Sequence, residues 1–314
     1  MNILIANPRG FCAGVDRAIE ITEKALSIFG APIYVKHEIV HNNYVVKNLE
    51  AKGAKFIENI ENLKEGSILI FSAHGVSNYI ENKAQEKNLK VFNATCPLVT
   101  KVHMEVQKYS DDKINTILIG HKGHPEVEGT IGRYKSTDQA RIFLVENIND
   151  VNALTLKNDE PVAYVTQTTL SLDDTEKIID HLKKRFKNLV GPKKEDICYA
   201  TQNRQNAVKK LSKKCDIILV VGSKNSSNSN RLKEIGTKAG VSTKLVDSEN
   251  DLKVEWFNNK NNIGLTAGAS APEILIQNIV SKLKEFGALE VTETEGVVEK
   301  TTFKIPKELN TLHR

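Results

Sequence analysis

The sequence has no long hydrophobic run, no CxxC pair and no basic stretch followed by an extended apolar region at its N-terminus. Its longest apolar stretches, such as residues 217–221, have the length of a β-strand, which excludes a transmembrane helix. The absence of a leader pattern predicts a cytoplasmic protein without a membrane partner. Four cysteines separated by 84, 102 and 17 residues, by subtraction of their numbers, do not match a secreted disulfide framework.

Several motifs that identify common enzyme classes are also absent. The chain contains no GxxxxGK[ST], GxGxxG, GxSxG or HEXXH, so nucleotide, dinucleotide, serine hydrolase and zinc protease motifs give no support. The formal net charge is only +5, and the lysines are scattered rather than gathered into a tract. We therefore expect no nucleic-acid partner.

The bulk composition is that of a globular protein with 40% hydrophobic and 26% charged residues. A length of 314 residues is enough for two or three domains.

Three of the four cysteines begin a similar stretch of sequence. A first polar loop follows each of them after 28 or 29 residues, and a second polar cluster follows after a further 33 or 44 residues, by subtraction of residue numbers. The three sets are Cys12, His41 and His74; Cys96, His124 and Thr168; Cys198, Ser226 and Ser270. Such a repeat predicts three similar units around a shared centre, and a soft metal suits the thiols. Cys215 has no counterpart, and we interpret it as a buried structural residue.

Each repeated cysteine is expected between a short strand and a helix. The strands are predicted at 3–6, 90–92 and 196–197, and the helical apolar spacing follows from Val15, Val99 and Ala207. A position near a helix N-terminus favours a thiolate and an anionic cluster. Further strands at 32–35, 116–119 and 217–221 lead into the first polar loops, which is the order of a parallel sheet with ligands beyond its strand ends.

The fold class is therefore predicted as α/β, with three similar parallel-sheet lobes in a threefold arrangement around a shared metal centre. The lobes are expected at residues 13–96, at 97–195, and at 196–314 together with 1–12. The third unit lacks a strand leading into a cysteine at its own end, so the N-terminal strand is expected to pack with it.

Three cysteines are one fewer than the thiolates of a fully protein-ligated four-iron cluster, which leaves one iron open for substrate. The polar loops carry His41, His74 and His124 and the run Ser226, Ser227 and Asn228, which offer donors for a phosphate or diphosphate. Lys224 and Arg231 are also candidates from their charge alone. Glu126 lies two residues after His124, where an extended segment would point both side chains the same way, and suits a general acid.

With these residues assembled, the chain closely resembles the LytB family of hydroxymethylbutenyl diphosphate reductases. The segments that carry the resemblance are 8–15 (PRGFCAGV), 72–77 (SAHGVS), 94–97 (ATCP), 120–126 (GHKGHPE), 166–171 (TQTTLS), 197–201 (ICYAT), 222–231 (GSKNSSNSNR) and 267–272 (AGASAP).

The resemblance implies a pseudo-threefold (trefoil) arrangement of the three lobes around a central iron–sulfur cluster. It implies that this cluster is a [4Fe-4S] cluster, one per chain, on the three ligands Cys12, Cys96 and Cys198. It implies substrate binding by His41, His74, His124, Thr168, Ser226, Ser227, Asn228 and Ser270. Glu126 and Thr168 are the implied catalytic residues of a proton relay, while Lys224 and Arg231 drop out.

The implied reaction is a two-electron reductive dehydroxylation of 4-hydroxy-3-methylbut-2-enyl diphosphate to isopentenyl and dimethylallyl diphosphate, the last step of the non-mevalonate pathway. The chain has no nicotinamide or flavin motif, so an external one-electron donor such as ferredoxin or flavodoxin is expected. Two alternatives stay open: a Cys/His zinc hydrolase acting on a phosphorylated metabolite, and a non-catalytic basic binding protein. The first gives no reason for three equivalent cysteines, and the second leaves the polar loops unexplained.

Overall fold

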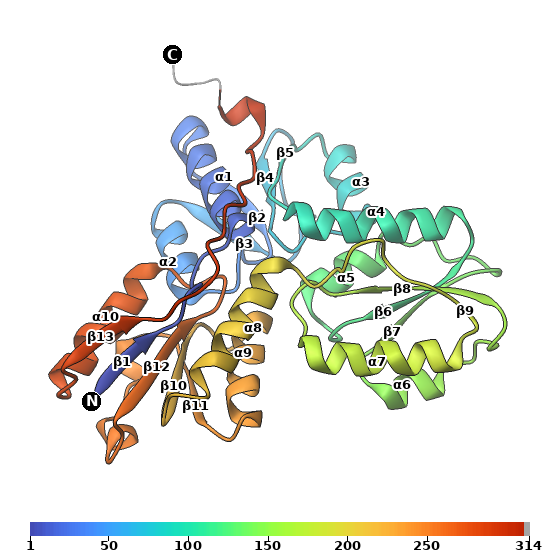
Figure 1. Ribbon diagram of the computed structural model, residues 1–314. Coiled ribbons are helices and arrows are strands. Elements are labelled where there is room, and N and C mark those ends of the chain that lie inside the picture. The colour runs from blue at the N-terminus through green and yellow to red at the C-terminus, as the bar shows by residue number, and fades with distance from the viewer. Residues whose placement is uncertain (311–314) are drawn as a thin grey trace. The chain divides into compact units, whose positions relative to one another are not determined.

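The computed structural model describes residues 1–310 and shows an α/β protein with three parallel sheets (Figure 1). This confirms the predicted fold class of three parallel-sheet lobes. The described residues form two compact units. The first contains residues 1–16, 40–48 and 199–302, and the second contains residues 17–39, 49–198 and 303–310.

The first unit is built on a five-stranded parallel sheet in the order β11-β10-β12-β1-β13. Its strands are β1 (Asn2–Ile5), β10 (Ile217–Val221), β11 (Ser242–Val246), β12 (Asn262–Ala267) and β13 (Glu290–Glu293). Its helical segments are α8 (Tyr199–Leu211), α9 (Ser227–Lys238), η1 (Glu249–Asp251), η2 (Val254–Phe257) and α10 (Glu273–Glu285). Strand β10 is buried at every position, as expected where helices cover both faces of a parallel sheet.

The N-terminal strand lies inside this C-terminal sheet, as predicted. Asn2 pairs with Asn262 of β12 on one side and with Glu290 of β13 on the other. Packing of α10 against the sheet buries Ile276, Ile279 and Leu283, which join the apolar core under β1 and β12.

The second unit contains two four-stranded parallel sheets. One has the order β3-β2-β4-β5, with strands β2 (Ile33–Lys36), β3 (Ala54–Ile57), β4 (Ile68–Phe71) and β5 (Lys90–Asn93). The other has the order β7-β6-β8-β9, with strands β6 (Asn115–Ile119), β7 (Ile142–Val145), β8 (Pro161–Thr166) and β9 (Asn188–Val190). Its remaining segments are α3 (Asn78–Glu86), α4 (Pro97–Asp111), α5 (Pro125–Ile131), α6 (Ile148–Ala153), α7 (Leu172–Arg185) and η3 (Lys307–Leu309). Two helices, α1 (Ala13–Phe29) and α2 (Asn43–Ala51), have residues in both units.

Each predicted lobe contains one of the three sheets, while the lobe boundaries stay a prediction. The predicted third lobe runs to residue 314, and residues 311–314 lie outside the described residues. One expected element is wrong: residues 196–197 form no strand, because the last strand before Cys198 is β9 and the chain then follows an irregular path to α8.

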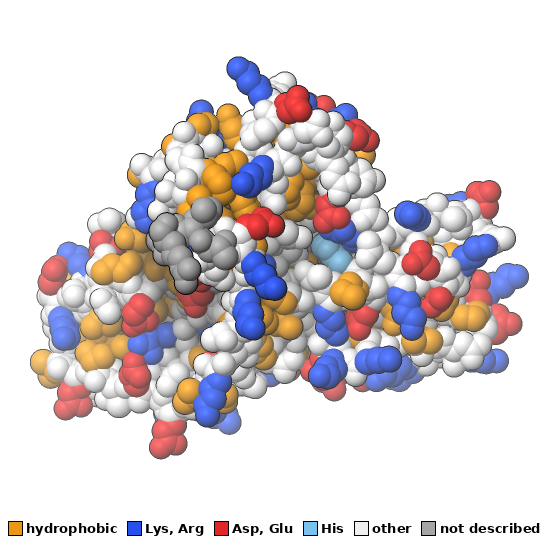
Figure 2. All heavy atoms as spheres, turned by 90° about the horizontal axis from the view of Figure 1, so that it is seen from above, with side chains coloured by type: hydrophobic (Ala, Val, Ile, Leu, Met, Phe, Trp, Pro, Cys, Tyr) orange, Lys and Arg blue, Asp and Glu red, His pale blue; other side chains and the backbone are white. Residues whose placement is uncertain are grey.

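Within residues 1–310, no helix combines the length and the apolar character needed to span a membrane. Figure 2 shows one face of the molecule, on which Lys and Arg side chains lie among Asp and Glu side chains.

Candidate functional site

The three repeated cysteines occupy equivalent places in the fold. Cys12, Cys96 and Cys198 each directly precede a helix, namely α1, α4 and α8. Each is half-buried, and none of the four cysteines, all within the described residues, forms a disulfide. The predicted position near a helix N-terminus is confirmed for all three.

The same kind of backbone hydrogen bond is found at all three cysteines. The N–H of Cys12 donates to the carbonyl of Ala269 at 3.3 Å, and the N–H of Cys96 donates to that of Ala73 at 3.0 Å. The N–H of Cys198 donates in the same way to Thr168 at 3.0 Å. In every case the acceptor belongs to the second polar cluster of the repeat, so each cysteine is anchored to a polar loop at a strand end.

Burial raises the pKa of Cys12, while hydrogen bonds from the backbone of Val15 and Gly14 and the charge of Arg204 oppose this effect. Cys215 is different: it is buried in the apolar cluster of α8, α9 and β10, and burial raises its pKa to about 11. Such a thiol is inert, in agreement with its interpretation as a structural residue.

In the first unit, the predicted polar residues form one connected group. The hydroxyl of Ser270 donates to the carbonyl of His41 at 2.9 Å. The side chain of Asn228 accepts from the N–H of Ala269 at 3.3 Å and donates to the hydroxyl of Thr201 at 3.3 Å. The loop that carries His41 therefore lies against the loops of Asn228 and Ser270.

The start of α9 supplies the hydroxyl-rich part of this group. Ser226 is its N-cap and accepts from the N–H of Ser229 at 3.3 Å, and Ser227 is the first helical residue. A helix N-terminus with hydroxyl and amide side chains is a suitable anion site. Arg231 instead forms an ion pair with Glu234 on its own helix, and Lys224 is exposed.

The second unit holds the other two predicted histidines. The rings of His74 and His124 meet edge to face, with their centroids 5.7 Å apart. His124 is the N-cap of α5, and its Nδ1 accepts from the N–H of Glu126 at 3.1 Å. A neutral His124 therefore carries its proton on Nε2, which makes that atom a hydrogen-bond donor.

Glu126 and Thr168 form a buried pair in the same unit. The carboxylate accepts from the Thr168 N–H at 2.6 Å and from the Thr168 hydroxyl at 3.0 Å. Only 3% of Glu126 is exposed, and burial raises its pKa to about 7, against the opposing effect of both hydrogen bonds. A carboxyl group that titrates near neutral pH is suited to general acid catalysis.

The backbone that carries Glu126 is not in the extended conformation that the sequence analysis considered for residues 124–126. Residues 124–126 are not extended, since Pro125 and Glu126 form the first turn of α5. A helix was expected after this loop, and Pro125 at the first helical position is the signal for its start before Glu126.

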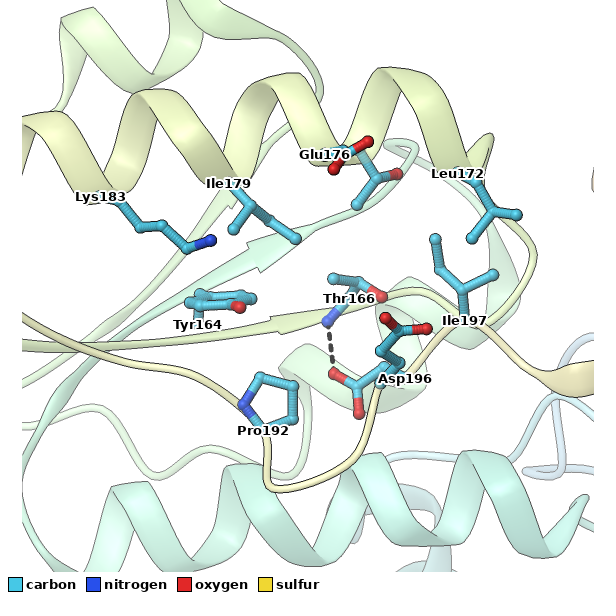
Figure 3. Close-up of a pocket in the computed structure, with 11 residues that line it drawn as sticks. Tyr164, Thr166, Leu172, Glu176, Ile179, Lys183, Pro192, Asp196 and Ile197 are labelled. Atoms are coloured by element: carbon cyan, nitrogen blue, oxygen red, sulfur yellow. Dashed lines mark hydrogen bonds between the residues drawn. The ribbon is translucent and has the colours of Figure 1, made fainter. Parts of the chain in front are cut away.

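Asp196 is a further buried carboxylate, and the sequence did not predict it. Its side chain accepts from the N–H of Thr166 at 2.8 Å (Figure 3). It also accepts from the ammonium group of Lys101 at 2.9 Å. Asp196 lines a cavity of about 300 Å³ between α7 and residues 192–197. Burial raises its pKa, and its charge contributes to the raised pKa of Glu126. A single sequence does not distinguish this aspartate from a surface one.

Among residues 1–310, no three His, Cys, Asp or Glu side chains converge as the ligands of a single metal ion would. A mononuclear zinc site requires such a group. The thiolates of a four-iron cluster bind different iron atoms, so they do not need to meet at one point.

Comparison with known proteins gives a consistent result along the whole chain. Residues 3–284 match the family model described as LytB protein. The chain is 58% identical over 309 residues to the 4-hydroxy-3-methylbut-2-enyl diphosphate reductase of Histophilus somni (strain 2336), and the alignment covers 98% of each protein. It is 56% identical over 309 residues to the enzyme of the same name from Pseudomonas aeruginosa (strain LESB58), again over 98% of each.

Two solved structures are similar as well. The E-1-hydroxy-2-methyl-but-2-enyl-4-diphosphate reductase of Plasmodium falciparum superposes with a TM-score of 0.93 at 43% identity, over 99% of this chain and 96% of that one. A second structure, of (E)-4-hydroxy-3-methyl-but-2-enyl diphosphate reductase, described as the terminal enzyme of the non-mevalonate pathway, has a TM-score of 0.65 at 33% identity. It covers 90% of this chain and is itself covered over 99%.

Proposed function

The chain belongs to the LytB family, and on this basis we propose that it is the oxidoreductase that converts 4-hydroxy-3-methylbut-2-enyl diphosphate to isopentenyl and dimethylallyl diphosphate. The reaction consumes two electrons and two protons and releases water, and it is the last step of the non-mevalonate pathway. The observation that carries the proposal is the buried pair of Glu126 and Thr168, because loss of a hydroxyl group requires a proton donor.

We further propose that Cys12, Cys96 and Cys198 hold one [4Fe-4S] cluster per chain. The donor set fits this group: three half-buried thiols, each before a helix and each anchored by the same backbone hydrogen bond. Three thiolates leave one of four irons without a protein ligand. When bound, the cluster supplies the electrons for cleavage of the allylic C–O bond.

The polar residues of both units are assigned to the substrate. Hydroxyl, amide and helix N-terminal groups donate hydrogen bonds to phosphate oxygens, and histidine adds charge when protonated. In the first unit these residues are His41, Ser226, Ser227, Asn228 and Ser270. In the second unit they are His74, His124 and Thr168.

Glu126 is assigned as the proton donor and Thr168 as the group that passes the proton on. Burial keeps the carboxyl group protonated up to about pH 7, and the Thr168 hydroxyl lies 3.0 Å from it. The N–H of Thr168 holds one carboxyl oxygen in place. When Glu126 is protonated, its other oxygen donates to the Thr168 hydroxyl, whereas the ionised form accepts from that hydroxyl. The proton thus starts from a fixed position, which is the condition for efficient transfer.

The electrons are proposed to come from an external one-electron donor such as ferredoxin or flavodoxin, because the sequence contains no nicotinamide or flavin motif. We place the reaction in the cytoplasm, where thiols that bear no disulfide stay reduced. The alternative of a zinc hydrolase is less well supported, because the family model and the relatives named above point to the reductase.

The test is iron and sulfide analysis with Mössbauer or EPR spectroscopy on anaerobically purified protein, with and without 4-hydroxy-3-methylbut-2-enyl diphosphate. We expect a brown protein with four irons per chain, a signal that changes on substrate addition, and both products after chemical reduction. A colourless protein that takes up no iron on reconstitution would contradict the proposal and favour the zinc alternative.

A further inference from the structure

Residues 294–299 run beside the stretch that leads to Cys12. They continue from β13, which pairs in parallel with β1, and Figure 1 shows this red segment beside the blue N-terminal strand. The N–H and the hydroxyl of Thr294 donate to the carbonyl of Ile5 at 2.8 and 3.1 Å. A Cβ atom added at Gly296 would overlap the backbone of Asn7, so the two stretches are in close contact. This 294–299 segment follows the last residue that the family model matches.

Arg204 of α8 holds the end of the same N-terminal stretch. Its guanidinium donates to the carbonyl of Gly10 through Nε at 3.1 Å and Nη2 at 2.8 Å, and to that of Phe11 at 3.2 Å. The side chain is completely buried. Both acceptors directly precede Cys12, so this guanidinium sets the path of the backbone into the cysteine.

Glu299 balances the charge of this buried guanidinium. Its carboxylate accepts from Nη1 of Arg204 at 3.0 Å and from the side chain of Asn203 at 2.9 Å. The side chain is 14% exposed, which is low for a glutamate in a segment whose other acid, Glu295, is exposed. Removing one partner of a buried ion pair leaves an uncompensated charge, so Arg204 depends on Glu299 to stay where it is.

We propose that the 294–299 segment positions Cys12, with Glu299 acting through Arg204 on the backbone of residues 10 and 11. The segment thereby determines how well the first cysteine is presented as a ligand. This inference rests on the proposed function only in taking Cys12 as a cluster ligand. The claim that Glu299 and Arg204 hold the backbone before Cys12 applies to the apoprotein as well, and the first experiment uses the apoprotein.

The first experiment measures the alkylation rate of each cysteine by iodoacetamide in the apoprotein, resolved by mass spectrometry. For Glu299→Gln we expect Cys12 to react about tenfold faster than in the wild type, because weakening a buried charged contact favours local opening. Cys96 and Cys198 should keep their rates, and buried Cys215 reports whether the fold is intact. The control Glu295→Gln removes the same charge from an exposed position and should leave all four rates unchanged.

An unchanged Cys12 rate in folded Glu299→Gln would overturn the proposal. If Cys215 also reacts faster, the double variant Arg204→Met with Glu299→Leu replaces the pair by apolar side chains, which is often tolerated. In that variant the alkylation of Cys12 should be faster than in the wild type, while that of Cys215 stays slow. Wild-type alkylation rates at both cysteines would again overturn the proposal.

The second experiment uses the reconstituted protein. An EPR-monitored redox titration should show a shifted midpoint potential for the double variant Arg204→Met with Glu299→Leu. This variant leaves the net charge of the pair unchanged, so a shift reports the altered position of Cys12. Glu295→Gln should keep the wild-type potential. Lower iron content without a shift in potential would reduce the segment to a general structural role and contradict the proposal. Wild-type protein that binds no iron would instead refute the proposed function and leave the alkylation result intact.

Discussion

The hydroxyl of Thr168 lies 3.0 Å from one carboxylate oxygen of Glu126, and the N–H of the same threonine lies 2.6 Å from the other oxygen. One residue therefore holds both oxygens of a carboxyl group that is almost completely buried. Burial favours the protonated form more strongly than the two hydrogen bonds favour the ionised form, so the pKa is raised to about 7.

Replacement of Glu126 by glutamine should separate activity from stability. We expect turnover to fall by about 10²–10⁴-fold, since a proton donor is lost while the shape is kept. In the wild type, the raised pKa makes the fold less stable as pH rises from 4.5 through about 7, because the unfolded chain releases its proton first. Glutamine does not ionise, so the unfolding free energy of Glu126→Gln should lack this decrease with rising pH. Urea unfolding of the wild-type and variant apoproteins at pH 5 and pH 8 measures the difference.

Thr168 should be sensitive to the loss of its hydroxyl and tolerant of the loss of its methyl group. Thr168→Val removes the hydroxyl that is hydrogen-bonded to one oxygen of Glu126, and this buried oxygen loses its partner. We therefore expect a destabilisation of about 1–3 kcal/mol and a large loss of turnover. Thr168→Ser keeps the hydroxyl and is the matched control. Equal turnover of the valine and serine variants would show that the hydroxyl does not pass the proton.

The repeat in the sequence predicted the three cysteine positions well for a physical reason. Each cysteine lies where a strand-end loop meets a helix start, and residue types that suit loops and helix starts are visible in sequence. The place of β1 was also predictable, because the C-terminal unit lacked a strand that only the N-terminus could supply.

The errors arose where tertiary contacts decide the outcome. A two-residue strand at 196–197 is too short to be recognised by periodicity, and the structure uses Asp196 instead to accept from Lys101 and from the N–H of Thr166. The raised pKa of Glu126 depends on burial, which a sequence does not contain. The partnership of Arg204 with Glu299 joins residues 95 positions apart and has no local signal.

Removal of the Lys101 ammonium should destabilise the second unit through Asp196. The aspartate side chain is fully buried and Lys101 is partly exposed, so we expect Lys101→Met to cost about 1–3 kcal/mol, less than for a fully buried pair. Lys108→Met removes an exposed lysine from the same helix and should change stability by less than about 0.5 kcal/mol. Thermal or urea unfolding of the apoproteins compares them, and equal stability would show that Asp196 is adequately held without Lys101.

His103 should make the fold sensitive to acid. This residue of α4 is buried, and burial together with the charge of Arg133 lowers its pKa to about 3. The unfolded chain binds a proton near pH 6.5, so stability is lost as pH falls from there towards 3. The expected contribution is about 2 kcal/mol at pH 5. His103→Leu removes the titration, so its unfolding free energy should fall less between pH 7 and pH 5 than that of the wild type. Parallel pH dependences would contradict the assignment.

Gly75, next to His74, should not accept a side chain. Its φ of +77° already disfavours alanine, and a Cβ atom would lie 2.6 Å from Cε1 of His103. Gly75→Ala should therefore cost the strain of a left-handed alanine, about 1–2 kcal/mol, plus about 1–3 kcal/mol of overlap. Gly240 has a φ of +83° with open space around it, so Gly240→Ala isolates the first cost.

A double variant separates the overlap with His103 from the backbone strain at Gly75. His103→Ala removes the imidazole that the new methyl group would meet, so Gly75→Ala should cost less in that background than in the wild type. The difference between the two costs is the coupling energy of the pair, expected at about 1–3 kcal/mol from the overlap alone. Urea unfolding of the four apoproteins at pH 7, where His103 is neutral in the folded state, measures it. A coupling energy of zero would mean that the loop of His74 moves away from α4 to accommodate alanine.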